Sequence, residues 1–463
     1  MTEYSLDEVL SPSSIAVIGA SRDPASVGQG VLKSLVNGCF KESGFCRPFK
    51  GKVYPVNPKA DEILGLKCFA SIKDISGQVD LAIVCVPASV VSVVARECGE
   101  KGVKGIIVLS AGFAELGEEG KKRQDELVGV CNEKGMTLIG PNCLGFLRPP
   151  AALNASFALS APAAGSVAFI TQSGALADSV IDWAIKERYA FSAILSAGNA
   201  AETGVAEFVE WAAQDPFTKV ITAYVEGVED GRKLMRAVRN ATQTKPVVIL
   251  KAGRAASDLA AVASHTGSMA GSYAVFEAAM KQSGAVCADS VEEMFDLAKA
   301  LAEQPALKEN AVVIVTNGGG AGVLCADYCA QYGVNLVALK PETIARLDAT
   351  GKMHSAYSRR NPLDLVGDAL AERYKAAVEV LLDESYVHGL IVVQTLQTMT
   401  QSMDDASLLI AARKRHPEKP IVSVFMGGKF SAEAINHLEA NNIPDFNDPK
   451  KAAKAMAALA GLL

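Results

Sequence analysis

His265 is the residue in this chain whose surroundings point most directly to covalent chemistry. It stands in the stretch ASHTGS, residues 263–268, and its neighbours Ser264, Thr266 and Gly267 all have small side chains. A histidine that packs inside a protein usually has bulkier neighbours, so this stretch leaves space around the imidazole. Because a neutral imidazole nitrogen is a nucleophile near neutral pH, the pattern indicates a histidine that can carry a transferred group.

Glu226 is the acidic partner that the sequence offers for this imidazole. It ends an apolar stretch in YVEGVED, residues 224–230. A carboxylate at a strand end can accept the Nδ1–H of a histidine and orient its other nitrogen for attack. From the residues alone, a surface glutamate at a strand end is the simpler interpretation. The remaining histidines lie in polar or helical contexts without ligand spacing, so no metal site is predicted; they are His354, His388, His416 and His437.

Two glycine-containing turns have the composition of phosphate-holding helix starts. TQSGAL contains Ser173 and Gly174, and TNGGGAG contains Gly319 and Gly320. Each motif places small residues between an apolar strand and a helix, which leaves N–H groups and about +0.5 charge facing a cleft. Ordinary turns need glycine too, so either motif alone leaves both interpretations open. Two such helix ends and one accessible histidine together favour a phosphoryl group carried on the histidine.

A third turn, VIGASRD at residues 17–23, follows the first apolar strand. Its glycine lets backbone N–H groups approach a phosphate at a helix start. It lacks the GxGxxG pattern and the later acidic residue of a dinucleotide fingerprint, and a plain tight turn explains it equally well. Lys59, after PVNP, adds a cation at a neighbouring strand end where an adenosine phosphate could be neutralised. Taken alone, Lys59 is more simply a solvated surface lysine.

The elements that must position these residues form three similar units, each opened by a strand, a glycine turn and a helix. The expected strand regions of the first unit are 14–20, 52–58, 80–87, 105–112 and 137–145. The second unit opens with a strand, turn and helix over 166–187, followed by strand ends at 194–202, 220–227 and 246–253, and the third opens in the same way over 311–333, followed by strands at 389–396 and 420–428. Strands that alternate with helices predict parallel, doubly wound sheets, which bind ligands at the carboxyl ends of their strands. We predict an α/β protein of three Rossmann- or flavodoxin-like domains: residues 1–147, 148–304 and 305–463. Residues 149–166, rich in Ala, Pro and Ser, are expected to form a loop or linker.

Composition limits the class of protein. The 463 residues are enough for about three domains, and 49% hydrophobic with only 6% aromatic residues suits aliphatic parallel sheets. A net charge of −6 without a basic run gives no support for a nucleic-acid or membrane partner.

No signal peptide is visible, and the apolar window 79–97 contains Asp80 and Pro87, which favours a buried strand and helix start over a membrane span. The ten cysteines form no CxxC pair, so we expect reduced, partly buried thiols in a cytoplasmic protein.

The ordered set of motifs resembles the NDP-forming acyl-CoA synthetase superfamily, in particular the α subunit of ADP-forming acetyl-CoA synthetases. Residues 1–147 are similar to its CoA-binding domain, with VIGAS, PVNPK, VPA and IGPNCLG in order. Residues 166–304 are similar to the first ligase domain, with TQSGAL, SAGNAAE, YVEG and SHTGSMAGS. Residues 305–463 are similar to the second ligase domain, with VTNGGGAG, NPLDLVGDA and VFMGG.

The resemblance implies a role for each candidate residue. His265 would be phosphorylated transiently, Glu226 would orient and stabilise it, and the helices that start near Ser173–Gly174 and Gly319–Gly320 would hold the phosphate. The residues expected to contact CoA are Gly19, Ala20, Ser21, Arg22, Lys59, Leu109, Ser110 and Ala111. Asp178 stands where succinyl-CoA synthetases have a tyrosine, so succinate cannot be carried over as the substrate.

The implied reaction is acyl-CoA + phosphate + ADP ⇌ carboxylic acid + CoA + ATP, through an acyl phosphate and a phosphohistidine. CoA or acyl-CoA and phosphate would bind this chain, together with a small carboxylic acid whose identity the sequence leaves open. No ATP-grasp domain is recognisable in the chain, so Mg-ADP or Mg-ATP is expected on a separate ATP-grasp β subunit, in an α2β2 assembly.

Two other functions are consistent with parts of the sequence. A CoA- or acyl-CoA-sensing module without catalysis would share the domains, but the intact SHTGS stretch and the lack of room for an acetyltransferase domain argue against it. An NAD(P)-dependent oxidoreductase would use the first domain, but the missing dinucleotide fingerprint argues against that.

Overall fold

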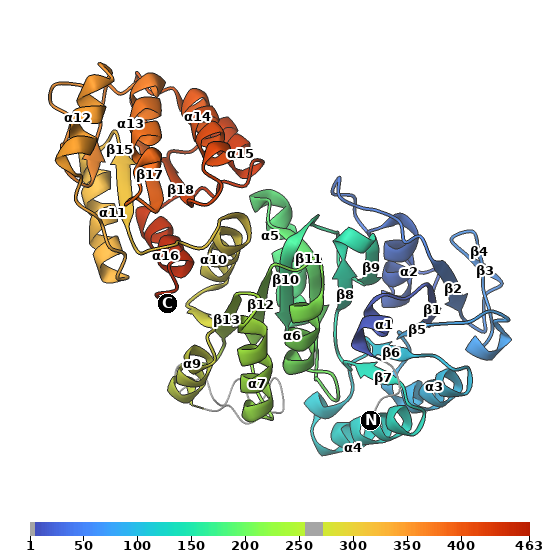
Figure 1. Ribbon diagram of the computed structural model, residues 1–463. Coiled ribbons are helices and arrows are strands. Elements are labelled where there is room, and N and C mark those ends of the chain that lie inside the picture. The colour runs from blue at the N-terminus through green and yellow to red at the C-terminus, as the bar shows by residue number, and fades with distance from the viewer. Residues whose placement is uncertain (1–4, 255–271) are drawn as a thin grey trace. The chain divides into compact units, whose positions relative to one another are not determined.

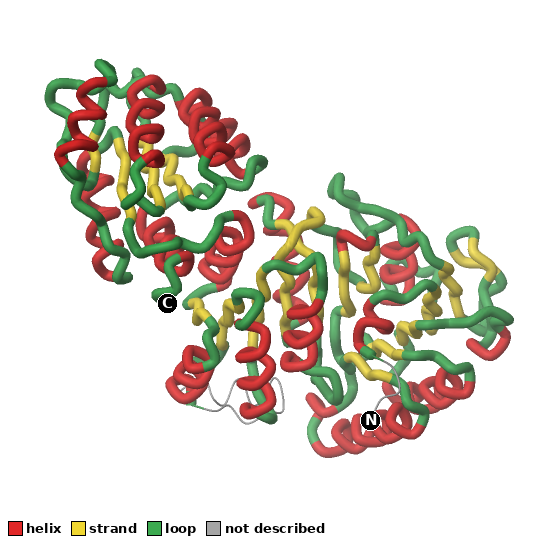
Figure 2. Tube along the Cα trace, viewed as in Figure 1, coloured by secondary structure: helices red, strands yellow, loops and turns green. Residues whose placement is uncertain are grey.

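The computed structural model describes residues 5–254 and 272–463 (Figure 1). The chain divides into two compact units, Met1–Asp289 and Ser290–Leu463. Helices and strands alternate through most of both units, as Figure 2 shows. The α/β class predicted from the sequence is confirmed, with three separate parallel or mostly parallel sheets.

The first sheet has five parallel strands in the order β2-β1-β5-β6-β7. They are β1 (Ser14–Ile18), β2 (Lys52–Val56), β5 (Leu81–Val84), β6 (Gly105–Val108) and β7 (Thr137–Ile139). The helices are α1 (Leu6–Leu10), α2 (Val27–Asn37), α3 (Ala88–Glu100) and α4 (Glu118–Glu133), with short turns η1 (Ile72–Asp74) and η2 (Ala114–Leu116) and the hairpin β3 (Glu62–Ile63) and β4 (Leu66–Lys67). The window 79–97 contains β5 and most of α3, so the predicted strand and helix start are confirmed.

The two faces of this sheet belong to separate cores because side chains alternate along each strand. Ile15 and Val17 pack in one core with α1 and α2, whereas Ala16 and Ile18 pack in another with α3 and α4. The chain order reverses between β1 and β5, so the point where ligands bind doubly wound sheets lies between the carboxyl ends of these two strands.

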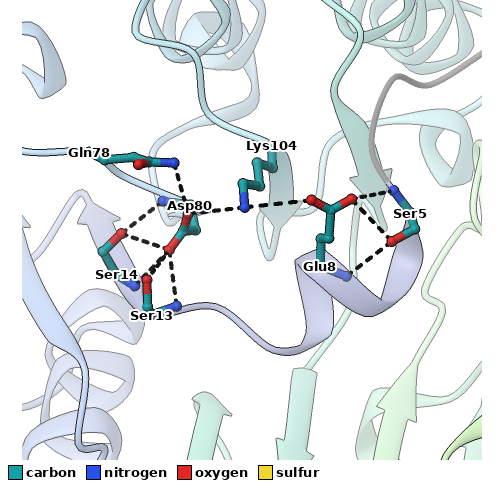
Figure 3. Close-up of polar contacts among 7 residues, drawn as sticks. All are labelled: Ser5, Glu8, Ser13, Ser14, Gln78, Asp80 and Lys104. Carbon is teal, nitrogen blue, oxygen red and sulfur yellow. Dashed lines mark hydrogen bonds and ion pairs between the residues drawn. The ribbon is translucent and has the colours of Figure 1, made fainter.

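Asp80 anchors the opposite, amino edge of the same sheet (Figure 3). Its carboxylate accepts hydrogen bonds from the backbone N–H groups and hydroxyls of Ser13 and Ser14 at 2.6–3.1 Å. Lys104 lies 3.4 Å from Asp80 and 3.6 Å from Glu8 of α1. Burial opposes the charge of Asp80, but these hydrogen bonds and the Lys104 ammonium outweigh it and lower the pKa of the carboxyl.

The second sheet has seven strands in the order β14-β13-β12-β10-β11-β8-β9. They are β8 (Gly145–Arg148), β9 (Leu153–Ser156), β10 (Ala163–Thr171), β11 (Ala190–Ser196), β12 (Val220–Val225), β13 (Val247–Lys251) and β14 (Val286–Ala288). The pairs β11–β8 and β8–β9 are antiparallel, and the others are parallel. The helices are α5 (Gly174–Glu187), α6 (Val205–Gln214), α7 (Gly231–Thr242) and α9 (Tyr273–Gln282), and η3 (Pro149–Ala151) is a short turn.

The expectation of a loop across residues 149–166 is wrong for about half of that stretch. β9 pairs with β8, and β10 begins at Ala163. Leu153 and Ala155 alternate into the core, which gives this Ala- and Ser-rich stretch a buried strand face despite its loop-like composition.

The two sheets of the first unit are joined by buried polar contacts. Arg148 of β8 donates to the Leu10 carbonyl oxygen at 3.3 Å and to Ser11 Oγ at 2.5 Å, both at the end of α1. Its guanidinium is held by an ion pair of 2.7 Å with Asp215 and lies 4.9 Å from the Trp211 ring. Near the carboxyl edges, Gly198 has φ 55°, and a Cβ there would lie 2.3 Å from the Pro141 carbonyl oxygen. Only glycine permits this close approach of the loop after β11 to the loop after β7.

The third sheet, in the second unit, has four parallel strands in the order β16-β15-β17-β18. They are β15 (Val312–Thr316), β16 (Leu363–Asp364), β17 (Gly389–Thr395) and β18 (Ile421–Met426). The helices are α10 (Val291–Glu303), α11 (Gly319–Gln331), α12 (Pro341–Ala349), α13 (Ala371–Asp383), α14 (Ser402–Arg415), α15 (Ala432–Glu439) and α16 (Pro449–Leu459). Helix α10 packs against α16 through the ion pairs Glu292–Lys451 and Glu293–Lys454, so it belongs to this unit.

The cysteines differ from the expectation in one pair. Cys39 and Cys46 form a disulfide, because the turn after α2 brings their Cα atoms to 5.5 Å, and the prediction of reduced thiols is wrong for them. The other eight cysteines are free. Among the described residues, no helix has both the length and the apolar character needed to cross a membrane.

Candidate functional site

The turn after β1 lies at the point where the order of the first sheet reverses. Gly19 has φ 90°, and a Cβ there would lie 2.9 Å from the Cys85 carbonyl oxygen, so glycine is required next to the end of β5. Asn57, after β2, donates from Nδ2 to the Ala20 carbonyl oxygen at 2.7 Å and fixes the turn. Ser21 is half-buried and Arg22 is exposed.

The other residues expected to contact CoA lie at the same edge. Lys59 is exposed, and its N–H donates to Asn57 Oδ1 at 2.9 Å. Leu109, Ser110 and Ala111 follow β6, and Ser110 Oγ donates to the Val86 carbonyl oxygen at 2.5 Å. The structure therefore brings all eight predicted residues to the carboxyl edge of one sheet. Residues 85–87 follow β5 and lie among these candidates. They were not predicted as site residues, although two of them belong to the motif VPA.

Glu226 lies at the carboxyl end of β12 and is buried, with 9% of its surface exposed. The Gln172 side chain, from the end of the adjacent β10, holds its backbone. Gln172 Oε1 accepts from the N–H groups of Glu226 at 2.6 Å and Gly227 at 3.1 Å, and its Nε2 donates to the Gly227 carbonyl at 3.0 Å. The interpretation of Glu226 as a simple surface glutamate is therefore wrong.

Lys251 holds the same backbone from the strand on the other side of β12. Its Nζ donates to the carbonyl oxygens of Glu226 at 2.8 Å and Ala252 at 2.5 Å. Burial lowers the pKa of Lys251, and the Glu226 charge opposes that shift. Burial, and then the Glu226 charge, raise the pKa of Tyr224.

A pocket of about 190 Å³ adjoins Glu226. Its lining includes Gln172 from the second sheet and Asn142 from the loop after β7 of the first sheet. Asn142 donates to Asn199 Oδ1 at 3.2 Å, and Asn199 donates to Glu115 Oε2 at 2.6 Å. The pocket thus lies where the carboxyl edges of the two sheets of the first unit meet.

The charged groups that line this pocket are mostly acidic: Glu202, Glu207, Glu226, Glu229 and Asp230, with Lys233. Glu202 accepts from the Leu138 N–H at 2.8 Å, and burial raises the pKa of its carboxyl. Lys233 forms an ion pair with Glu207. Gln172, Lys251, Asn142 and Asn199 were not predicted as site residues, although Gln172 stands in TQSGAL and the two asparagines stand in IGPNCLG and SAGNAAE.

Ser173 and Gly174 lie at the start of α5, as predicted. Ser173 is the N-cap, and its Oγ accepts from the Leu176 N–H at 3.3 Å. The earlier N–H groups of the helix have no intrahelical acceptor, which suits an anion. On the second turn, Asp178 accepts from the Leu159 N–H at 2.9 Å, so this carboxylate ties α5 to the segment before β10.

Gly319 and Gly320 begin α11 in the second unit. Gly320 is exposed, with no atoms within 4 Å of a Cβ built on it. A Cβ at Gly319 would lie 2.7 Å from Asp364 Oδ2, so a carboxylate already stands beside this helix start. His265 falls within residues 255–271, outside the described residues.

Three family models together match most of the chain. They are a CoA binding domain at residues 13–149, a succinyl-CoA ligase like flavodoxin domain at 164–301 and a ligase-CoA domain at 312–461. The resemblance inferred from the motifs, and the assignment of an α/β sheet to each of the three domains, are confirmed.

Full-length relatives and a solved structure agree with these matches. The acetate–CoA ligase (ADP-forming) II subunit alpha of Pyrococcus furiosus is 42% identical over 98% of this chain and 97% of its own length. The acetate–CoA ligase (ADP-forming) I of Archaeoglobus fulgidus is also 42% identical, and the chain spans 63% of its length. The acetyl-coenzyme A synthetase 1 of Ca. Korarchaeum cryptofilum, solved with phosphate and ADP, matches with a TM-score of 0.92 at 37% identity, over 98% of this chain and 96% of that one.

The acyl substrates named for relatives are not uniform. A 4-hydroxybutyrate–CoA ligase (ADP-forming) of Nitrosopumilus maritimus is 32% identical over 97% of this chain and 63% of its own length. What the relatives share is ADP-forming acid–CoA ligation. The chain belongs to the family of ADP-forming acetyl-CoA synthetase α subunits, within the NDP-forming acyl-CoA synthetases, and is an ADP-forming acyl-CoA ligase subunit.

Proposed function

We propose that this chain carries the CoA and phosphate steps of acyl-CoA + phosphate + ADP ⇌ carboxylic acid + CoA + ATP. Residues 1–147 bind CoA, residues 148–304 carry the phosphorylated His265, and residues 305–463 complete the ligase part. A phosphate oxygen attacks the thioester carbonyl, the C–S bond breaks, and CoA leaves as the thiol with an acyl phosphate remaining. A nitrogen of His265 then attacks phosphorus, the P–O bond to the acyl group breaks, and the carboxylate leaves.

The observation that carries this proposal is the buried Glu226 beside a pocket shared by two carboxyl edges. Asn142 lines that pocket from the domain whose turns are expected to bind CoA. Glu226 is expected to accept the Nδ1–H of His265, orient its other nitrogen and stabilise the positive imidazole that phosphorylation produces. The start of α5 at Ser173 and Gly174 supplies N–H groups for the phosphoryl oxygens without side-chain movement.

A small carboxylic acid such as acetate is the proposed acyl substrate. The pocket of about 190 Å³ supports a small acyl group. The names of the Pyrococcus and Archaeoglobus relatives support acetate, while the 4-hydroxybutyrate relative keeps other short acids in the class to be tested.

A nucleotide-binding partner completes the proposed enzyme. The Pyrococcus relative is named as an alpha subunit, and the Archaeoglobus relative is longer than this chain. We propose that an ATP-grasp β subunit binds Mg-ADP, takes the phosphoryl group from His265 and assembles with this chain as α2β2.

Labelling with radioactive phosphate tests the proposal. The chain, with its β subunit, is incubated with acetyl-CoA and labelled phosphate without ADP, and acid-labile, base-stable label should appear on this chain. His265→Ala should lose the label, whereas His437→Ala, on the exposed face of α15, should keep it. Label that persists in His265→Ala would remove the assignment, and CoA binding without any label would favour a sensing module.

A further inference from the structure

Lys251 is a buried lysine at the carboxyl end of β13, next to the strand that carries Glu226. Its exposed fraction is 6%. The two hydrogen bonds from Nζ go to main-chain carbonyl oxygens, of Glu226 and of the following Ala252. The ammonium also lies 5.8 Å from the centroid of the Phe276 ring.

A neutral donor could satisfy those carbonyl oxygens, so hydrogen bonding alone does not explain a buried charge. Removing an ammonium from water is costly unless an opposite charge is close. The residue whose backbone Lys251 binds carries such a charge in its side chain, and Coulombic attraction between Lys251 and Glu226 raises the pKa of the lysine against the effect of burial.

Glu226 shares its pocket with several other carboxylates. Glu202, Glu207, Glu229 and Asp230 line the same pocket, and Lys233 is paired with Glu207. Like charges disfavour the ionised form of a carboxyl, and an opposite charge favours it. Tyr224 of β12 is a further titratable neighbour, and the Glu226 charge contributes to raising its pKa.

Backbone geometry gives Lys251 a second effect on the same residue. β12 lies between β10 and β13, so Gln172 and Lys251 hold the Glu226 main chain from the two neighbouring strands. The direction of the Glu226 side chain follows from the main chain that these two residues fix.

We propose that Lys251 is a positioning residue that keeps Glu226 ionised and correctly directed in the pocket. The proposal rests on the proposed function, in which the Glu226 carboxylate serves the phosphorylated histidine. A residue with only a structural role would change stability but not the pH at which phosphoenzyme forms.

The experiment measures the rate of phosphoenzyme formation from acetyl-CoA and labelled phosphate between pH 5 and 9 in the full chain with its β subunit. In Lys251→Met, the acid-side midpoint should move up by roughly one pH unit or more, because an opposite charge is removed from beside a carboxylate. The rate should fall at least about tenfold below the midpoint and recover at high pH. Lys251→Arg keeps the charge and should keep the midpoint near that of the wild type.

Lys245→Met is the matched control. Lys245 precedes β13 at its other end, and its Nζ also donates to two carbonyl oxygens, those of Ala212 at 2.9 Å and Asp215 at 2.7 Å. The Lys245→Met variant should change the thermal midpoint of unfolding without moving the pH profile of phosphoenzyme formation. A Lys251→Met loss that high pH does not restore, or a profile identical to that of the wild type, would overturn the inference.

Glu226→Gln separates this inference from the proposed function. If Glu226→Gln labels at the wild-type rate, the catalytic role of Glu226 is wrong. If it loses label while Lys251→Met has the wild-type profile, only the role of Lys251 is wrong. Lys251→Met added to Glu226→Gln should reduce the residual labelling no further, because both changes act through one carboxylate.

Discussion

Replacing Asp80 by asparagine should destabilise the first unit from the edge opposite its proposed site. Asp80 is 4% exposed, and one carboxylate oxygen accepts all four hydrogen bonds from Ser13 and Ser14. The other oxygen lies 3.3 Å from Gln78 Nε2 and 3.4 Å from Lys104 Nζ. These partners belong to the starts of β1, β5 and β6, so one carboxylate joins three strands.

The magnitude follows from the charge rather than from the number of bonds. An asparagine oxygen can still accept from the two serines, but the bonds lose charge assistance and Lys104 loses its buried partner. A hydrogen bond to a charged group contributes about 1.5–3 kcal/mol, and the retained amide oxygen recovers part of that, so we expect a loss of about 3 kcal/mol at pH 7. For a unit of this size the corresponding fall in Tm is roughly 6–12 °C.

The stabilisation that Asp80 contributes should increase with pH. The pKa of Asp80 is lowered in the folded protein, so its stabilisation is fully present above the unfolded-state pKa of about 3.9. That stabilisation is lost as pH falls through the folded pKa. The free-energy difference between wild type and Asp80→Asn should therefore be full at pH 7 and shrink below about pH 4.

Tryptophan fluorescence reports this unit alone, because the chain has two tryptophans, Trp183 and Trp211, and both lie before residue 289. Urea unfolding followed at this signal gives the free energy at each pH. Glu100→Gln, which removes an exposed ion pair with Lys73, is the control and should leave the curve unchanged. A loss below about 1 kcal/mol for Asp80→Asn at pH 7, or an equal loss at pH 3 and pH 7, would refute the reasoning.

Two further predictions concern ligands. In isothermal titration the chain alone should bind CoA but not Mg-ADP, and turnover to ATP should require the β subunit; tight ADP binding with ATP formation by this chain alone would contradict the division between subunits. Lys59→Ala should weaken CoA binding by up to about fivefold, because an exposed charge contact contributes at most about 1 kcal/mol. Lys52→Ala, at the exposed amino end of the same β2, should leave CoA affinity unchanged, and an equal effect of the two changes would argue against phosphate contact by Lys59.

Most of the fold was predictable because aliphatic strands and glycine turns are local signals. The stretch at residues 14–20 gave β1 and its turn, and the window 79–97 gave β5 and α3. The failures have a common cause. β9 has the Ala- and Ser-rich composition of a loop and becomes a strand by pairing with β8. The Cys39–Cys46 disulfide depends on the turn after α2, and neither the composition nor the cysteine spacing indicated these contacts.

The candidate site was predictable to the same extent. Glu226 was proposed because it ends an apolar stretch, and the eight CoA-contact candidates, implied by the family resemblance, follow strands of one parallel sheet. Gln172 and Lys251 were missed because their partners lie 54 and 25 residues away on neighbouring strands. Gln172 stands inside the TQSGAL turn and Lys251 at an ordinary strand end, and only the order β10-β12-β13 brings them to Glu226.

Two groups of buried charged residues in the first unit lie at opposite edges of its sheets, so stability and the proposed chemistry can be tested apart. At the amino edges, Asp80 meets Lys104, and Asp215 meets Arg148 at 2.7 Å, so buried charges are paired with fixed partners. At the carboxyl edges, several carboxylates line one pocket, and the buried Lys251 ammonium binds the main chain of Glu226. The proposed role of Lys251 is to favour the ionised form of the Glu226 carboxyl, whereas the amino-edge pairs stabilise the fold. A variant that alters the pH profile while leaving the urea curve of the first unit in place must therefore act at the carboxyl edge.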